Sequence, residues 1–485
     1  MQNLQKEGKQ MKLNIYWIFL ITLILNGCST SNDLVIPQIE FPSEYQHNNT
    51  IDKKDSIVEE MWWENFQDKK LSSLIEETLK NNYDLQIAMV NISLNRASLS
   101  SKVSERYPTL ELQGSANKQK TSASVFESTT QNKYNNYSLS AVLNYELDLW
   151  GKYKNAENSA KSSLLASYAA RDTIKLSLVA SVIDNYFTLI SLNEQLNIIN
   201  QIISAKEEEL KRYQRQYNVG SISKIDIYQE NSSLTNINIE RNSIQQAISL
   251  QKSTLAILVG KTPKEIDEFC KEVFEEKLPK DIIVPINLPS ELLNNRPDIK
   301  QAEENLKASN YDIAVAKAMY FPNISLTGLI GFESMNLDNL FQSNSAKNSL
   351  GSSLVSPILN TGKISANVDS AKNNKELAEI NYKKTVQQAF QEVYDILNKR
   401  NIILQDIEHQ KAHYTNMSEI FRITQNQYKQ GYIDYIALQN AKLNYLSSQT
   451  NLIRLNQSLL SSTVSLYKAL GGGWNKEYLK NIEKL

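Results

Sequence analysis

Residues 107–112 read YPTLEL and residues 321–326 read FPNISL, so one short pattern occurs twice, 214 positions apart. The neighbouring features repeat as well. LWGK at 149–152 returns as NTGK at 360–363, and QYNVG at 216–220 returns as QYKQG at 427–431. Each half therefore reads helix, strand pair, long helix, turn, long helix. A duplicated unit that cannot bury its own apolar faces packs against copies of itself, which predicts a wall assembled from several chains.

The first strand pair carries the alternation that is typical of a membrane β-barrel. Between residues 136 and 149, apolar or aromatic side chains occupy every second position, and only Val142 interrupts the polar row between them. This period of two places Leu143 on a lipid-facing side of the strand and Asn144 on the opposite, lumen-facing side.

A second hairpin is predicted in the second repeat. Alternating residues at 324–332 form one strand, a tip follows near 334–347, and a weakly alternating strand follows near 348–359. Two hairpins give four strands per chain, whereas the smallest membrane barrels have about eight. The barrel must therefore close across chains, unless the strands belong to a half-buried sheet of a soluble protein.

The remainder of the chain is predicted to be long helices. Gly occurs 14 times and Pro 10 times in 485 residues, and neither occurs from about Asn155 to Tyr217. That span predicts one helix of roughly 90 Å. The mean hydropathy of −0.42 indicates helices that are wetted on both sides and bury narrow seams.

The start of the chain resembles a lipoprotein signal sequence. Residues 13–25 are almost wholly apolar and too short for a membrane-spanning helix. They end in LNGC at 25–28, which resembles a lipoprotein cleavage box with an unusual Asn26 and predicts Cys28 as the lipid-bearing first residue. By analogy with bacterial lipoproteins, Ser29 favours the outer membrane. An ordinary signal peptide with an incidental cysteine is the alternative.

Composition excludes several classes of function. A net charge of −1 provides no basic field for nucleic acid. With Cys28 lipidated, Cys270 has no partner within the chain, so no disulfide is expected. After residue 25 no apolar run approaches the ~18 residues of a transmembrane helix.

No catalytic or metal site is predicted. His409 and His413 are one helical turn apart, a spacing of metal ligands, but two exposed helix residues are the simpler interpretation. Arg296-Pro297-Asp298 is interpreted as a helix start, with Pro297 at its first position and Asp298 in its first turn. The chain is therefore expected to be no enzyme and to carry no cofactor beyond the covalent lipid.

Two motifs of the chain are specific to one family of proteins: RPD at 296–298 and LGGGW at 470–474. Further motifs accompany them: WW at 62–63 with Phe66 and Leu71, NYDL at 82–85, YELDLWG at 145–151, Ile299, AKA at 316–318, FP at 321–322 and LYKA at 466–469. With these motifs, almost the whole chain after the signal sequence resembles the TolC-type outer-membrane efflux factors, in their OprM-like lipoprotein branch.

The resemblance implies a mainly α-helical chain with membrane β-structure. Three copies would form a twelve-strand outer-membrane barrel, continuous with a long periplasmic α-helical barrel and a mixed equatorial domain. It implies a homotrimer in contact with outer-membrane lipid, with a periplasmic adaptor (membrane fusion) protein and an inner-membrane RND-type transporter as partners. The implied function is the passive duct of a tripartite pump that carries drugs or other small solutes.

The predicted organisation follows the duplication. It comprises a signal peptide at 1–27, an extended tether at 28–60, a first repeat at 61–295 with strands at about 107–150, a second repeat at 296–474 with strands at about 321–360, and a tail at 475–485. A structural or adhesive surface lipoprotein built of helical rods is the alternative function, but such a protein needs no amphipathic hairpins.

The two helix–helix turns, at 217–226 and 428–436, are the candidate functional site. The resemblance places the periplasmic aperture and the adaptor contact at these tips. Gly220 and Gly431 permit the chain reversals, and Tyr432 lies in the second turn.

An acidic residue lines the constriction of OprM-like channels, and Asp434 holds the matching position here, between Gly431 and the last helix. Asp226 is the candidate on the first turn. Three copies would form a ring of negative charge. Each aspartate is also a candidate cap of the following helix, a role that does not exclude the first.

Overall fold

The computed structural model describes residue 34 and residues 36–37, 61–120, 133–274, 276–282, 284 and 295–472. The predicted signal peptide, Cys28 and the tip residues 121–132 lie outside this range. The described residues belong to two compact units. One holds residues 34 and 36–37, Ile92–Ser167 and Ala302–Tyr382, and the other holds the described residues of Ile39–Asn91, Tyr168–Gln301 and Lys383–Leu485. Each unit therefore draws on both repeats of the sequence.

The two repeats fold into the same order of elements, which confirms the duplication. The first helices have 22 residues each, the long helices 67 each, and the last helices 36 and 35. In the same order, these pairs are α3 (Tyr83–Ser104) and α8 (Pro297–Ala318), α4 (Lys152–Asn218) and α9 (Lys363–Lys429), and α5 (Lys224–Val259) and α10 (Tyr435–Ala469). The run without Gly or Pro is one helix, α4, as predicted.

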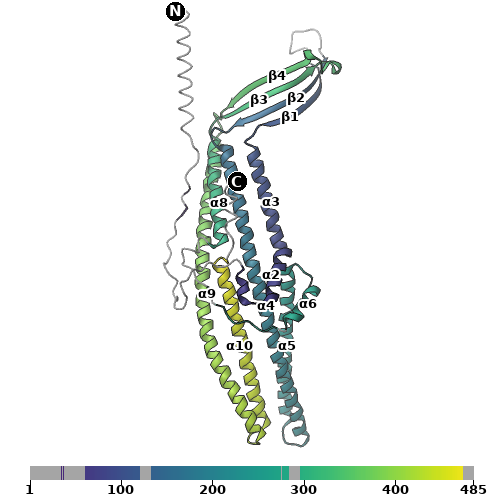
Figure 1. Ribbon diagram of the computed structural model, residues 1–485, viewed down its shortest axis with the longest axis vertical. Coiled ribbons are helices and arrows are strands. Elements are labelled where there is room, and N and C mark those ends of the chain that lie inside the picture. Colours follow the sequence, from purple (N-terminus) through teal and green to yellow (C-terminus); the bar gives the residue numbers. More distant parts are fainter. Residues whose placement is uncertain are drawn as a thin grey trace, which may run out of the picture. The chain divides into compact units, whose positions relative to one another are not determined.

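The first unit contains a four-stranded antiparallel sheet in the order β1-β2-β3-β4 (Figure 1). The strands are β1 (Thr109–Lys120), β2 (Lys133–Leu147), β3 (Asn323–Ser334) and β4 (Ala346–Val355). Two short 3-10 turns, η2 (Leu337–Asn339) and η3 (Ser343–Ser345), occupy the predicted second tip. Because sheet order follows chain order, β1 and β4 are both edge strands within the described sheet.

Prolines set the strand ends that the alternation misplaced. The fourth strand was predicted to reach residue 359, but β4 ends at Val355, two residues before Pro357. The first strand begins at Thr109, directly after Pro108. Proline has no N–H to donate to a strand ladder, so pairing stops beside it.

In the second unit, aromatic side chains hold the segment around Trp62 against the end of the described chain. Trp62, in the 3-10 helix η1 (Trp62–Phe66), stacks on Tyr467 with ring centroids 4.4 Å apart. Asp68, which caps α2 (Lys69–Asn81), accepts a 2.7 Å hydrogen bond from the Tyr186 hydroxyl. Gly471 packs directly against the Asn295 backbone. Only glycine fits there, because a Cβ at this position would lie 2.1 Å from the Asn295 carbonyl oxygen.

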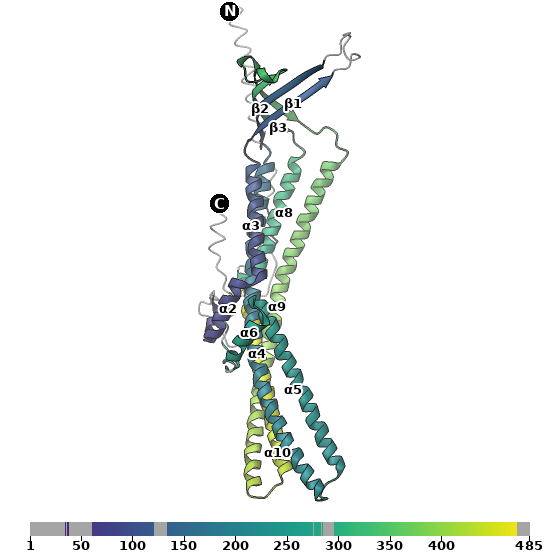
Figure 2. The same cartoon turned by 90° about the vertical axis from the view of Figure 1, so that its right-hand side faces the viewer.

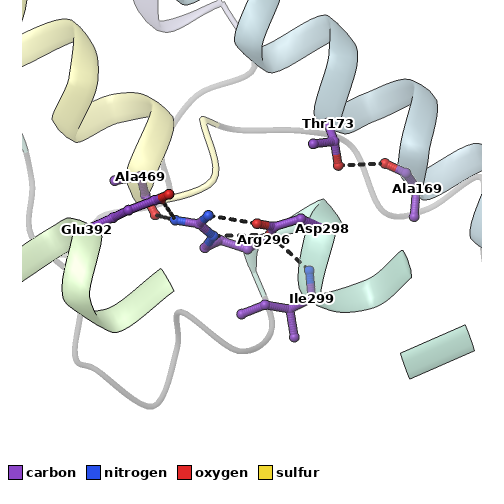
Figure 3. Close-up of polar contacts among 7 residues, drawn as sticks. All are labelled: Ala169, Thr173, Arg296, Asp298, Ile299, Glu392 and Ala469. Atoms are coloured by element: carbon purple, nitrogen blue, oxygen red, sulfur yellow. Dashed lines mark hydrogen bonds and ion pairs between the residues drawn. The ribbon is translucent and has the colours of Figure 1, made fainter. Parts of the chain in front are cut away.

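Arg296 joins three helices of the second unit (Figure 3). Its guanidinium donates to both carboxylate oxygens of Asp298, at 3.1 and 2.7 Å, to Glu392 of α9 at 2.8 Å, and to the Ala469 carbonyl at the end of α10 at 3.0 Å. α8 begins at Pro297 with Asp298 in its first turn, which confirms the structural interpretation of this motif.

One expectation about apolar runs was wrong. Within the described residues, α4 includes an 18-residue window with a mean hydropathy of 1.3, apolar enough to cross a membrane by composition. Half of that window is buried inside the chain. α4 contributes Ile183, Tyr186 and Phe187 to the core of the second unit, so its apolar content is explained by packing.

Candidate functional site

The sheet has one apolar face and one polar face. The register pairs Leu143 with Leu110 on one side and Gly328 on the other, and it pairs Asn144 with Thr109 and Thr327. Directly paired residues point to the same side of a sheet. Leu143 and Asn144 therefore lie on opposite faces, as the alternation predicted. Apolar residues also predominate on the Leu143 face of β3, from Ile324 to Phe332.

Hydrogen bonds connect the polar face across the strands. The Ser115 and Ser138 hydroxyls are 2.8 Å apart, and Glu333 accepts from Asn136 at 3.0 Å and from Lys347 at 2.6 Å. Val142, the one apolar interruption of the polar row in β2, pairs with Leu329 of β3 and is 7% exposed. This face is built for contact with water, and the opposite face for contact with lipid.

The two helix hairpins of the second unit end in the same kind of turn, at one end of this unit (Figure 2). Gly220 and Gly431 have φ angles of 76° and 80°, which disfavour a residue with a Cβ. The amide of Ser221 donates to the Gln216 carbonyl at 2.8 Å, and the amide of Tyr432 donates to the Gln427 carbonyl at 3.0 Å. Both turns are Schellman motifs.

Both candidate aspartates cap helices, in different positions. Asp434 is the N-cap of α10 and accepts from the Ala437 amide at 2.8 Å. On the first turn the N-cap is Ser223, and Asp226 completes a capping box by accepting from the Ser223 amide at 2.8 Å. Asp434 is exposed, and Tyr432 beside it is 76% exposed. Capping therefore fixes the place of each carboxylate.

Arg212 links the two hairpins close to their tips. Its guanidinium lies 3.3 Å from the Tyr435 ring centroid, and it donates to the Tyr428 hydroxyl at 3.2 Å. The Tyr435 hydroxyl donates in turn to Glu208 at 3.2 Å and receives a hydrogen bond from Gln439. One arginine of α4 therefore holds residues from α9 and α10.

The sequence contains a signal for this contact in the differences between its two repeats. With the offset of 211 between the two long helices, Arg212 stands where the second repeat has Ile423, and Tyr435 stands where the first has Lys224. Positions at which duplicated halves differ are candidates for contacts between the halves.

Close to the first turn, α4 and α5 enclose three charged side chains. Lys206, Glu209 and Glu230 are 8%, 3% and 8% exposed. The Lys206 ammonium lies 2.9 Å from Glu209 and 3.0 Å from Glu230. Burial raises the pKa of Glu209, Lys206 opposes this shift, and the second carboxylate, Glu230, adds to it.

This cluster predicts a hairpin whose packing strengthens in acid. Glu209 binds a proton more readily in the packed hairpin than in separated, hydrated helices. The contribution of this proton to the stability of the packed hairpin is therefore complete below the ordinary pKa of a carboxyl group. It is lost as the pH rises through the elevated pKa of Glu209. Glu209→Gln imitates the protonated form and is expected to raise the protection factors of the amides at the end of α4 against hydrogen exchange and to make these factors independent of pH. Glu207→Gln, an exposed neighbour, should leave the wild-type profile intact. A Glu209→Gln profile that still follows the wild type would contradict the assignment.

The remaining chemical candidates are peripheral. His409 and His413 are exposed on α9. In the part of the chain that the structure describes, no three His, Cys, Asp or Glu side chains are grouped as metal ligands. Cys270 is buried in α6 (Pro263–Val273), and burial raises the pKa of its thiol to about 11. That shift makes it unreactive at neutral pH.

Comparison with known proteins assigns the family. The family model for outer membrane efflux proteins matches residues 74–261 and 288–472. The chain belongs to the outer membrane efflux protein family. The solvent efflux pump outer membrane protein SrpC of Pseudomonas putida is 32% identical over 460 residues, which cover 93% of this chain and 97% of SrpC. The cation efflux system protein CusC of Escherichia coli is 27% identical over 457 residues, which cover 94% and 98%.

A solved structure agrees with this assignment. The CmeC outer membrane channel of Campylobacter jejuni superposes with a TM-score of 0.84 at 26% identity, covering 94% of this chain and 98% of CmeC. As a member of this family, the chain is an outer-membrane efflux channel with a large periplasmic extension and is not an enzyme. The alternative of a structural or adhesive lipoprotein made of helical rods is therefore wrong.

Proposed function

We propose that three copies of this chain close one passive duct through the outer membrane. The observation that carries the proposal is the sheet, which has one apolar face, one polar face and two edge strands. Unpaired edges cannot face lipid, because every backbone polar group there needs a partner. Pairing β1 of one copy with β4 of the next satisfies both edges and gives twelve strands from three chains.

Native mass spectrometry of the detergent-solubilised protein tests this assembly. The expected species contains three chains, and heating should convert it to single chains of altered electrophoretic mobility. A folded single chain that keeps its strand content in detergent would contradict closure across chains.

The hairpin tips are proposed to receive a periplasmic adaptor, which connects the duct to an inner-membrane RND-type transporter. Apolar side chains are exposed at these turns, with Val219 and Tyr432 each 76% exposed and Ile225 65% exposed. Such residues are candidates for burial against a protein partner. SrpC and CusC are named as parts of efflux systems, which agrees with a duct that passes drugs or other small solutes supplied by its pump.

Lipidation at Cys28 is proposed as a second attachment to the outer membrane, beside the barrel. Cys28→Ser is expected to abolish incorporation of radiolabelled palmitate while the protein still reaches the membrane. One lipid anchor adds reversible binding, whereas the barrel holds the trimer in place. Equal labelling of the wild type and the variant would exclude Cys28 as the acceptor.

Asp434 is proposed to contribute a ring of negative charge at the periplasmic aperture. Asp434→Asn keeps an N-cap residue and removes the charge, whereas Asp434→Ala removes both. Both variants are expected to raise single-channel conductance in a planar bilayer and to weaken block by divalent cations. If Asn behaves as the wild type and only Ala differs, Asp434 acts through its helix cap and the charge ring is excluded.

A further inference from the structure

The charged residues of the described strands are divided between the two faces of the sheet. All three carboxylates, Glu111, Glu146 and Glu333, lie on the polar face, and Lys347 on that face is paired with Glu333. The apolar face carries the other three charged side chains of these strands, and all of them are lysines: Lys118, Lys120 and Lys133. A face built for lipid therefore carries positive charge without a carboxylate from these strands.

The three lysines lie together at one end of the β1–β2 pair. The register places Lys120 directly opposite Lys133, with Lys118 two positions along β1 on the same face. Like charges directly opposite each other destabilise a strand pair, because the Cβ atoms are about 5 Å apart. All three side chains are exposed. An anion between them would turn this repulsion into attraction.

The position of the three lysines along the strands matches the surface of the membrane. On the apolar face of β2, Leu147 and Tyr137 are ten residues apart, which is ~34 Å along the strand and ~26 Å along the membrane normal at a tilt of ~40°. The apolar band of an outer-membrane barrel is ~25 Å tall. Tyr137 lies on the same face of β2, four residues from Lys133, where an interfacial aromatic belongs. The lysines therefore lie just beyond the apolar band.

The connection of the strands decides which surface this is. The opposite ends of β1 and β2 lead into α3 and α4, which belong to the periplasmic part, so the lysine end faces the cell exterior. The outer leaflet there consists of glycolipid that carries phosphate groups on its sugar headgroup. Ammonium groups at the height of these phosphates, above leucines that contact acyl chains, match both parts of such a lipid.

We propose that Lys118, Lys120 and Lys133 form a binding site for the headgroup phosphates of outer-leaflet glycolipid. Acyl chains lie along Leu139 and Ala141 of β2, in the outer half of the apolar band, and the three ammonium groups contact phosphate. The site rests on the proposed placement of the sheet in the outer membrane. It depends neither on the helix–helix turns nor on a pump partner. It is a lipid contact of the folded barrel, separate from the predicted lipid on Cys28.

Native mass spectrometry of the full chain in detergent, titrated with lipid A, tests the site. Bisphosphorylated lipid A is compared with fully dephosphorylated lipid A that has the same acyl chains, and inorganic phosphate is added as a competitor. The wild type is expected to bind the phosphorylated form at least about tenfold more tightly. The Lys118→Gln/Lys120→Gln/Lys133→Gln variant should lose this preference, and the corresponding triple Arg variant should keep it.

Lys347→Gln is the matched control, because it removes a lysine from the opposite face of the same sheet and should keep the preference. Lys133→Gln alone should weaken it severalfold and serves if the triple variant does not fold. The proposal is overturned if the triple Gln variant retains the preference or if the wild type binds both lipids equally. Displacement of the lipid by inorganic phosphate at comparable concentration would also overturn it. A protein that conducts but does not discriminate these lipids would contradict this site alone and not the duct.

Discussion

Leu143→Arg is expected to reduce the amount of folded, membrane-inserted protein sharply, whereas Asn144→Arg is expected to have a small effect. Leu143 lies on the apolar face near the middle of the membrane span of β2, where an arginine costs roughly 2–4 kcal/mol per chain in contact with lipid. Its neighbour lies on the polar face beside Thr327 and would place the same charge in water. The comparison holds charge and strand position nearly constant and changes the face.

Heat-modifiable migration of membrane fractions measures the folded protein in both variants. If both substitutions reduce it equally, the assignment of faces is wrong. A one-residue shift of register would exchange the two results, since it moves every side chain to the other face.

Arg296→Met is expected to destabilise the second unit by about 2 kcal/mol. The substitution keeps the apolar stem and removes a guanidinium that is held by Asp298, Glu392 and the Ala469 carbonyl. Loss of one partner of a fully buried ion pair costs about 3–5 kcal/mol, and the smaller figure here allows for solvent that reaches both carboxylates. Arg296 and Asp298 have side-chain exposures of 10% and 27%, and Glu392 is 54% exposed.

Tryptophan fluorescence during urea unfolding measures this effect, because Trp62 stacks on Tyr467 in the same unit. Arg422→Met is the matched control. Arg422 pairs with Glu419 along the surface of α9 with 62% of its side chain exposed, so its removal should change the free energy of unfolding by less than about 0.5 kcal/mol. Equal destabilisation by the two variants would show that Arg296 does not hold the helices together.

The sequence predicted those features that depend on spacing along the chain. The absence of Gly and Pro between about Asn155 and Tyr217 predicted α4, and the period of two around Leu143 predicted both faces of β2. The repeated QYNVG and QYKQG patterns located two turns of the same Schellman type. In each case the cause is local, because glycine at a positive φ and alternation along a strand act within a few residues.

Contacts between distant parts of the chain were not predictable in this way. Arg212 and Tyr428 are 216 residues apart in sequence and meet because two hairpins pack side by side. The buried cluster of Lys206, Glu209 and Glu230 likewise depends on the register of α4 against α5, which no single helix pattern specifies. The sequence also left open whether Asp434 caps a helix, and a hydrogen bond to the Ala437 amide answered that question.

Planar-bilayer recording of the purified protein tests the central claim, that the assembled chains form one conducting path through the outer membrane. Discrete conductance steps are expected from the wild type, and larger steps from Arg212→Ala, because this substitution removes the side chain that joins α4 to Tyr428 and Tyr435. Absence of discrete steps from both proteins, with each folded and inserted in the bilayer, would contradict the account.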